Sequence, residues 1–137
     1  QVAFLSMHRY PFWPGTGGAD ETGSEAGRGT NRNLPVEFGT PRDRQLALFD
    51  RELNAFAAKH RPQLVLVSAG FDSHKNDPVG SLGLESEDFK QLSEVVLGIA
   101  DQYCDGRLVS MLEGGYNPSA LAECVEIHLQ SLVDVEN

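Results

Sequence analysis

Two segments of the sequence carry side chains whose types and spacing could do chemistry. Asp72 follows a strongly apolar run and begins the pattern Asp72-x-His74-x-x-Asp77, and Tyr116 follows a pair of glycines. A carboxylate fixed at a strand end suits Zn²⁺, and a phenol beside a reacting carbonyl can donate a hydrogen bond to the developing oxyanion. The same residues also suit simpler roles, a turn carboxylate and a surface tyrosine. We interpret His74 as a loop residue and Asp77, which precedes Pro78, as the start of a turn.

A glycine-rich stretch over residues 8–40 contains the adjacent bulky aromatic residues Phe12 and Trp13. It has no periodic pattern, and a loop of this length in a compact domain is typical of either a functional or a disordered segment. The two aromatic side chains could line a pocket or hold the loop against the core. The sequence leaves both roles open.

The elements that must position these residues follow from the apolar pattern. Thr40 is expected to cap a helix with Pro41 at its first position, Ser86 to cap a second helix, and Pro118 to open a third. The apolar runs predict strands at residues 2–7, 63–68 and 107–112, and the helical spacing predicts helices at 41–61, 86–104 and 118–132. The run at 63–68 is continuous, as expected for a parallel strand covered on both faces.

This order predicts an α/β fold, a parallel sheet with helices on both faces, with the connectivity β-α-β-α-β-α. Ligands bind at the carboxyl ends of the strands in such sheets. The strand ends carry Ser6-Met7-His8, then Asp72, then Gly114-Gly115-Tyr116. We therefore expect the polar residues to gather on one rim of the sheet.

Composition excludes several classes of protein. The 137 residues include 11 Lys and Arg against 20 Asp and Glu, a net charge of −9, which argues against direct nucleic-acid binding. No apolar run approaches the ~20 residues that span a bilayer, and the start resembles no signal peptide. Because the chain begins at Gln1, we expect a fragment or a processed chain. Cys104 and Cys124 lie on apolar helical faces, which indicates reduced thiols and a cytoplasmic location.

Several segments in a fixed order resemble the zinc-dependent histone deacetylase family, which includes bacterial acetylpolyamine amidohydrolases and acetoin-utilisation proteins. The matching segments are Ser6-Met7-His8-Arg9, Phe12-Trp13-Pro14-Gly15-Thr16-Gly17, Asn33-Leu34-Pro35, Leu66-Val67-Ser68-Ala69-Gly70-Phe71-Asp72 with Asp77-Pro78, and Leu112-Glu113-Gly114-Gly115-Tyr116-Asn117. The resemblance implies an arginase/deacetylase-like fold. It also implies hydrolysis of the acetyl amide of acetyl-lysine or of an acetylated polyamine.

The resemblance also implies roles for individual residues. Asp72 corresponds to one ligand of a zinc site, and Tyr116 to the catalytic tyrosine that polarises the acetyl carbonyl. Ser6 and the Met7 carbonyl correspond to ligands of a structural K⁺. The expected substrate-binding residues are Trp13, Val79, Gly114 and Gly115.

The sequence departs from the family in length. The paired histidines and the Asp-x-His segment of the family are absent, so we expect residues 1–137 to be the C-terminal portion of a single catalytic domain. One carboxylate cannot hold catalytic zinc, which usually takes three protein ligands. We therefore predict that the isolated chain is inactive and self-associates through unpaired sheet edges. Two alternatives remain open, a non-catalytic module that binds acetylated ligands or partners and a ureohydrolase of the related arginase-like fold.

Overall fold

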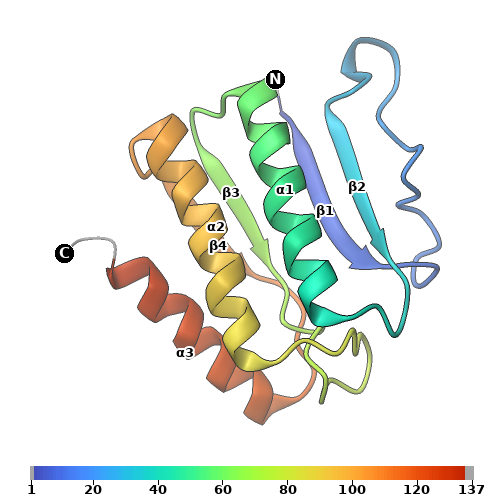
Figure 1. The fold of residues 1–137 in the computed structure, drawn as a ribbon, viewed down its shortest axis with the longest axis vertical. Coiled ribbons are helices and arrows are strands. Elements are labelled where there is room, and N and C mark those ends of the chain that lie inside the picture. The colour runs from blue at the N-terminus through green and yellow to red at the C-terminus, as the bar shows by residue number, and fades with distance from the viewer. Residues whose placement is uncertain (1, 135–137) are drawn as a thin grey trace.

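The computed structural model describes residues 2–134, apart from the side chain of residue 134, as an α/β fold (Figure 1). No helix in this range is long and apolar enough to cross a membrane. The elements confirm the predicted α/β class and add one strand to it. In chain order they are β1 (Phe4–Arg9), a 3₁₀ helix (Glu25–Gly27), β2 (Asn31–Val36), α1 (Arg42–His60), β3 (Val65–Ala69), α2 (Ser86–Cys104), β4 (Leu108–Leu112) and α3 (Pro118–Asp134).

Strand β2 is the element that the apolar pattern does not predict, because it lies within the stretch interpreted as a loop. It pairs in parallel with β1, with His8 opposite Pro35. Proline removes a ladder donor and argues against a central strand. Here β2 pairs with one strand only among the described residues, so the missing N–H is tolerated. Leu34 and Val36 are buried, and β2 therefore belongs to the core.

Strands β3 and β4 form a second parallel pair. Burial alternates along β3, where Leu66 is 61% exposed and its neighbours Val65 and Val67 are partly buried. The prediction that this strand is covered on both faces is therefore wrong for the part of the chain described. Helices α1 and α2 lie in front of the strands in Figure 1, and the opposite face, with Leu66, Val109 and Met111, stays exposed.

Helix α1 begins one residue later than expected, at Arg42, with Pro41 at the cap position. The Thr40 hydroxyl donates to the Glu37 carbonyl instead of capping the helix. The expected apolar stripe is only partly buried, and the most deeply buried residue of α1 is polar. Gln45 is fully buried, and its side-chain amide donates to the backbone carbonyls of Thr40 and Leu82, at 2.9 and 2.8 Å. This amide fixes α1 to the loop after β3.

Helix α2 is capped by Glu85, one residue before the Ser86 expected from the sequence. Glu85 and Asp88 form a reciprocal capping box, in which each side chain accepts the backbone N–H of the other residue. Arg42 at the start of α1 donates two hydrogen bonds to the Asp88 carboxylate, at 2.7 and 2.9 Å. The starts of the two helices are therefore held together. Helix α3 begins at Pro118, as predicted.

The main core lies between the loop after β3 and helices α2 and α3. Phe71, Leu84, Phe89 and Cys124 form one buried cluster. Cys104 is also buried, and both cysteines are free thiols, as expected. The loop that carries Asp72 is therefore held through its neighbour Phe71.

The two strand pairs are separate sheets, with no ladder between them among the residues described. Each of the four strands has one backbone partner there, so each pair has unpaired edges. Edges of this kind are templates for pairing with another polypeptide. The described part of the chain therefore has the unpaired sheet edges on which the self-association prediction rests.

Candidate active site at the carboxyl ends of the strands

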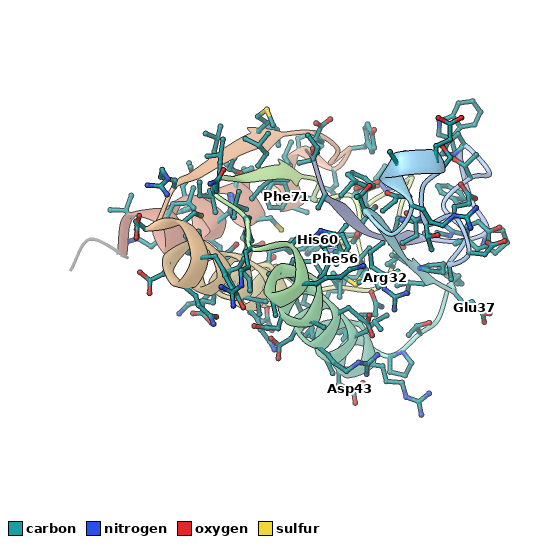
Figure 2. The ribbon with its side chains drawn as sticks, turned by 90° about the horizontal axis from the view of Figure 1, so that it is seen from above. Arg32, Glu37, Asp43, Phe56, His60 and Phe71 are labelled. Carbon is teal, nitrogen blue, oxygen red and sulfur yellow. The ribbon has the colours of Figure 1, made fainter. Side chains whose placement is uncertain are left out.

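The direction of Asp72 is set by the residue before it. Phe71, labelled in Figure 2 just beyond the end of β3, packs against Phe89 with ring centroids 5.2 Å apart. Its N–H donates to the Gly114 carbonyl at 2.8 Å, which joins the loop after β3 to the turn after β4. One side of this segment is anchored in the core, and Asp72 follows at the rim.

The Asp72 carboxylate is half-buried among glycines. A side chain at Gly114 would lie 3.1 Å from its carboxyl carbon, and one at Gly80 would lie 2.9 Å from its Oδ2. Burial raises the pKa of Asp72, the negative charge of Asp77 raises it further, and a backbone hydrogen bond opposes them. A nearby cation would favour the ionised form. The setting therefore fits the predicted role of Asp72 as one metal ligand.

Asp77 joins the loop after β3 to the turn after β4. Its Oδ1 accepts the N–H groups of Val79 and Gly80 at 2.8 and 3.0 Å, and its Oδ2 accepts the N–H of Tyr116 at 2.7 Å. Burial alone would raise the pKa of Asp77, but backbone donors, including that of Asn117, outweigh it and lower the pKa. The sequence predicted only a turn here, and the structure adds the bond to Tyr116.

Tyr116 lies in the segment between β4 and α3, two residues before the helix, and its side chain is 57% exposed. Asn117 caps α3, because its Oδ1 accepts the N–H groups of Ser119 and Ala120. Its Nδ2 donates to the Asn76 carbonyl at 2.9 Å. Two consecutive residues, Tyr116 and Asn117, are therefore both bonded to the loop that carries Asp72.

The two glycines before Tyr116 have different surroundings. Gly114 lies against the Asp72 carboxylate, and its predicted role in substrate binding stays a prediction. Gly115 has φ of +140°, and a side chain there would lie 2.7 Å from Leu121 and 3.4 Å from Phe71. Gly115 therefore allows α3 to pack closely on the core, because a side chain at this position would point into neighbouring protein atoms.

Arg9 brings the aromatic loop to the same rim. Its guanidinium lies over the rings of Phe12 and Phe38, 4.3 and 4.8 Å from their centroids, and donates to the Gly80 carbonyl at 3.0 Å. Trp13 is 87% exposed, so it does not hold the loop against the core. Val79 is also exposed, and substrate binding by Trp13 and Val79 stays a prediction.

Ser6, Met7 and His8 lie within β1, which ends at Arg9, so they do not follow the strand end as expected. His8 Nε2 contacts the Gly17 carbonyl at 3.0 Å, and Nδ1 contacts the Ser6 hydroxyl at 2.9 Å. Because a carbonyl only accepts, Nε2 carries the proton and Ser6 donates to Nδ1. His8 thus fixes the glycine-rich loop, and K⁺ binding by Ser6 and Met7 stays a prediction.

His74 lies in the loop after β3, as predicted, and the structure adds that its side chain is buried there. It is 4% exposed, with Nε2 3.3 Å from the Ser86 hydroxyl, and its Nδ1 accepts the Asn76 N–H. It therefore packs inside the loop rather than beside Asp72. Within residues 2–134, no group of three or more His, Cys, Asp or Glu side chains could hold a metal ion. Asp72 offers one ligand, and the described residues do not complete the set.

The histone deacetylase domain matches residues 1–132. The chain belongs to the histone deacetylase family. Among curated relatives of this family member, a probable deacetylase of Archaeoglobus fulgidus is 36% identical over 117 residues, which cover 85% of this chain and 33% of that protein.

Solved structures agree with the family assignment. The HDA15 HD domain superposes with a TM-score of 0.86 at 30% identity, and an acetylpolyamine aminohydrolase from Burkholderia pseudomallei with 0.84 at 26% identity. Each match covers 96% of this chain and 37% of the solved chain. The arginase/deacetylase-like fold is therefore confirmed, and the chain spans about a third of the length of the relatives it matches.

Proposed function

We propose that the whole protein containing this chain is a zinc-dependent deacetylase that hydrolyses the acetyl amide of an acetyl-lysine side chain or an acetylated polyamine. The observation that carries this proposal comes from a chain of the histone deacetylase family, in which the Asp77 carboxylate bonds the loop of Asp72, at Gly80, to the backbone of Tyr116. Asp72 and Tyr116 lie in loops that follow different strands. Their connection through Asp77 supports a shared active site.

Each residue has a distinct task in this proposal. Asp72 supplies one carboxylate ligand, and bound zinc would supply Lewis-acid polarisation and a water of lowered pKa. The exposed Tyr116 hydroxyl donates a hydrogen bond to the carbonyl oxygen as negative charge develops on it. Trp13 and Val79 line the approach for the apolar stem of the substrate.

The charge of the chain favours a basic substrate. A net charge of −9 attracts polyamines and lysine-rich segments, and salt weakens this attraction. The described residues provide only one metal ligand, so the proposal assigns activity to the whole protein and none to residues 1–137 alone. The two buried thiols also suit the reducing cytoplasm, which is the location we propose.

The test measures the whole protein on acetyl-lysine peptides and acetylated polyamines, with its zinc content determined. Tyr116→Phe should keep the zinc and lower kcat by roughly 10²–10³-fold, the usual effect of removing one oxyanion donor. Asp72→Ala should lose the zinc together with the activity. Tyr103→Phe, at the far end of α2, is the matched control and should retain the wild-type rate.

Two results would contradict this proposal. Wild-type rates in both Tyr116→Phe and Asp72→Ala would remove the assigned roles. Binding of an acetylated ligand without turnover by the zinc-loaded whole protein would instead support a non-catalytic binding module.

A further inference from the structure

The Asp77 carboxylate divides its two oxygens between two loops. Oδ1 accepts from Val79 and Gly80, two and three residues further along, which is an ordinary turn arrangement. Oδ2 accepts from the Tyr116 N–H, 39 residues further along, at 2.7 Å. A turn needs only the first oxygen, so the turn alone does not account for the second bond.

The turn side of Asp77 is connected to Asp72 through Gly80. Gly80 lies so close to Asp72 that an added side chain would be 2.8 Å from the Asp72 carbonyl carbon. The next residue, Ser81, donates its N–H to the Asp72 carbonyl at 2.8 Å. The backbone of Asp72 therefore contacts Gly80 and Ser81, and Gly80 donates its N–H to the Oδ1 of Asp77.

The Tyr116 side of the link depends on the backbone. Its hydroxyl has no hydrogen-bond partner within residues 2–134, and its side chain is 57% exposed. The placement of the phenol therefore depends on the Tyr116 backbone. Among the described residues of the loop that carries Asp72, Asp77 is the one that accepts the Tyr116 N–H directly.

We propose that Asp77 is a positioning residue, whose carboxylate sets the backbone of Tyr116, and with it the phenol, relative to Asp72. The inference rests on the proposed deacetylase function for its catalytic consequence. Asp77 is 5% exposed and its carboxylate bonds to backbone N–H groups, so it acts through its neighbours and does not contact the substrate. Loss of a fraction of an ångström in alignment lowers the rate of a positioned reaction steeply.

Asp77→Asn is the most informative substitution, because it keeps the shape of the side chain. An amide has one acceptor oxygen and one NH₂ group, so one side of the bridge then has two donors facing each other. Asp77→Glu keeps the charge and both acceptors on a longer stem. Asp101→Asn, on an exposed surface of α2, is the matched control for loss of one negative charge.

The kinetic test uses the zinc-loaded whole protein. Asp77→Asn is expected to lower kcat by roughly 10–100-fold while KM and zinc content stay as in wild type. In a Tyr116→Phe background the same substitution should change kcat by less than about threefold, because the group that it positions is gone. Asp77→Glu should recover part of the rate, and Asp101→Asn should match wild type.

Equal losses from Asp77→Asn in both backgrounds would overturn the proposal, because they would show a role independent of the phenol. Loss of zinc in parallel with rate would also overturn it, since Asp77 would then act through Asp72. These outcomes differ from failure of the proposed function, in which the wild-type protein itself is inactive.

Hydrogen exchange at the Tyr116 amide tests the placement without any activity. The wild-type amide should exchange slowly, and the Asp77→Asn amide at least tenfold faster, while amides within α2 are unchanged. An unprotected wild-type Tyr116 amide overturns the inference even if neither Asp77 variant folds.

Discussion

Two glycines of this chain should respond in opposite ways to the same substitution. Gly80 is buried against Asp72, and an alanine methyl there would lie 2.8 Å from the Asp72 carbonyl carbon and 2.9 Å from its Oδ2. Gly98 lies in the interior of α2 and would place its methyl in open space, with no atom within 4 Å. The pair therefore separates a local clash from the general effect of replacing glycine.

The magnitudes follow from these distances. Ordinary contact begins at 3.4 Å, and a methyl at position 80 would lie well inside that distance from the carbonyl oxygen and carbon of Asp72, which are backbone atoms that cannot rotate away. Overpacking of this kind usually costs about 1–3 kcal/mol of folding free energy. Gly98→Ala should instead stabilise the protein by about 0.5–1 kcal/mol, because alanine is the better helix former.

Urea unfolding followed by circular dichroism measures both effects on the whole protein. The midpoint should fall for Gly80→Ala and rise for Gly98→Ala, with an unchanged slope against urea. Gly80→Ala should also bind zinc more weakly, because the methyl displaces Asp72, whereas Gly98→Ala should bind it as wild type does. Equal midpoints for the two variants, or wild-type zinc affinity in Gly80→Ala, would refute the assigned packing around Asp72.

Three further outcomes are expected. Burial lowers the pKa of His128 from about 6.5, so the folded state favours the neutral ring. The free energy of unfolding should therefore be highest above pH 6.5 and decline as the pH falls below it. Urea midpoints measured against pH should show this decline, and His128→Gln should remove it. Asn33→Ala should destabilise the protein by about 1–3 kcal/mol, because the buried amide donates to the Gly18 and Glu21 carbonyls, and an unchanged melting temperature would contradict it. Residues 1–137 alone should associate through their unpaired edges, and a stable monomer in size-exclusion chromatography would exclude this.

The fold could be predicted where its signal is local. The periodic stripes of α2 and α3 and the apolar runs of β3 and β4 placed these elements within one or two residues. Strand β2 could not be found in this way, because Pro35 interrupts its pattern and its burial depends on the parallel pairing with β1. The sequence also did not reveal that the described elements cover β3 on one face only, because an apolar run does not show which elements pack against each face of a strand.

The helix starts show the same limit at smaller scale. Both Thr40 and Ser86 are good caps by residue type. Yet α2 is capped by Glu85 within a reciprocal box with Asp88, which Arg42 holds from another helix. The predicted range of this helix, 86–104, is confirmed, but the capping residue is Glu85, in a box that also makes an ion pair with Arg42 of another helix.

The candidate site contains residues that act through their side chains and residues that bond to the backbone of others, and the sequence reveals the two kinds unequally. Asp72 and Tyr116 could be predicted as site residues from the sequence because their reactive groups are side chains, and a sequence motif records side chains. Asp77 and Arg9 support the site through the N–H of Tyr116 and the carbonyl of Gly80, groups that almost every residue carries. The sequence does not reveal such a bond, because the backbone group that takes part in it is the same for almost every residue type. Supporting residues of this kind become visible only when the fold brings their backbone partners to them.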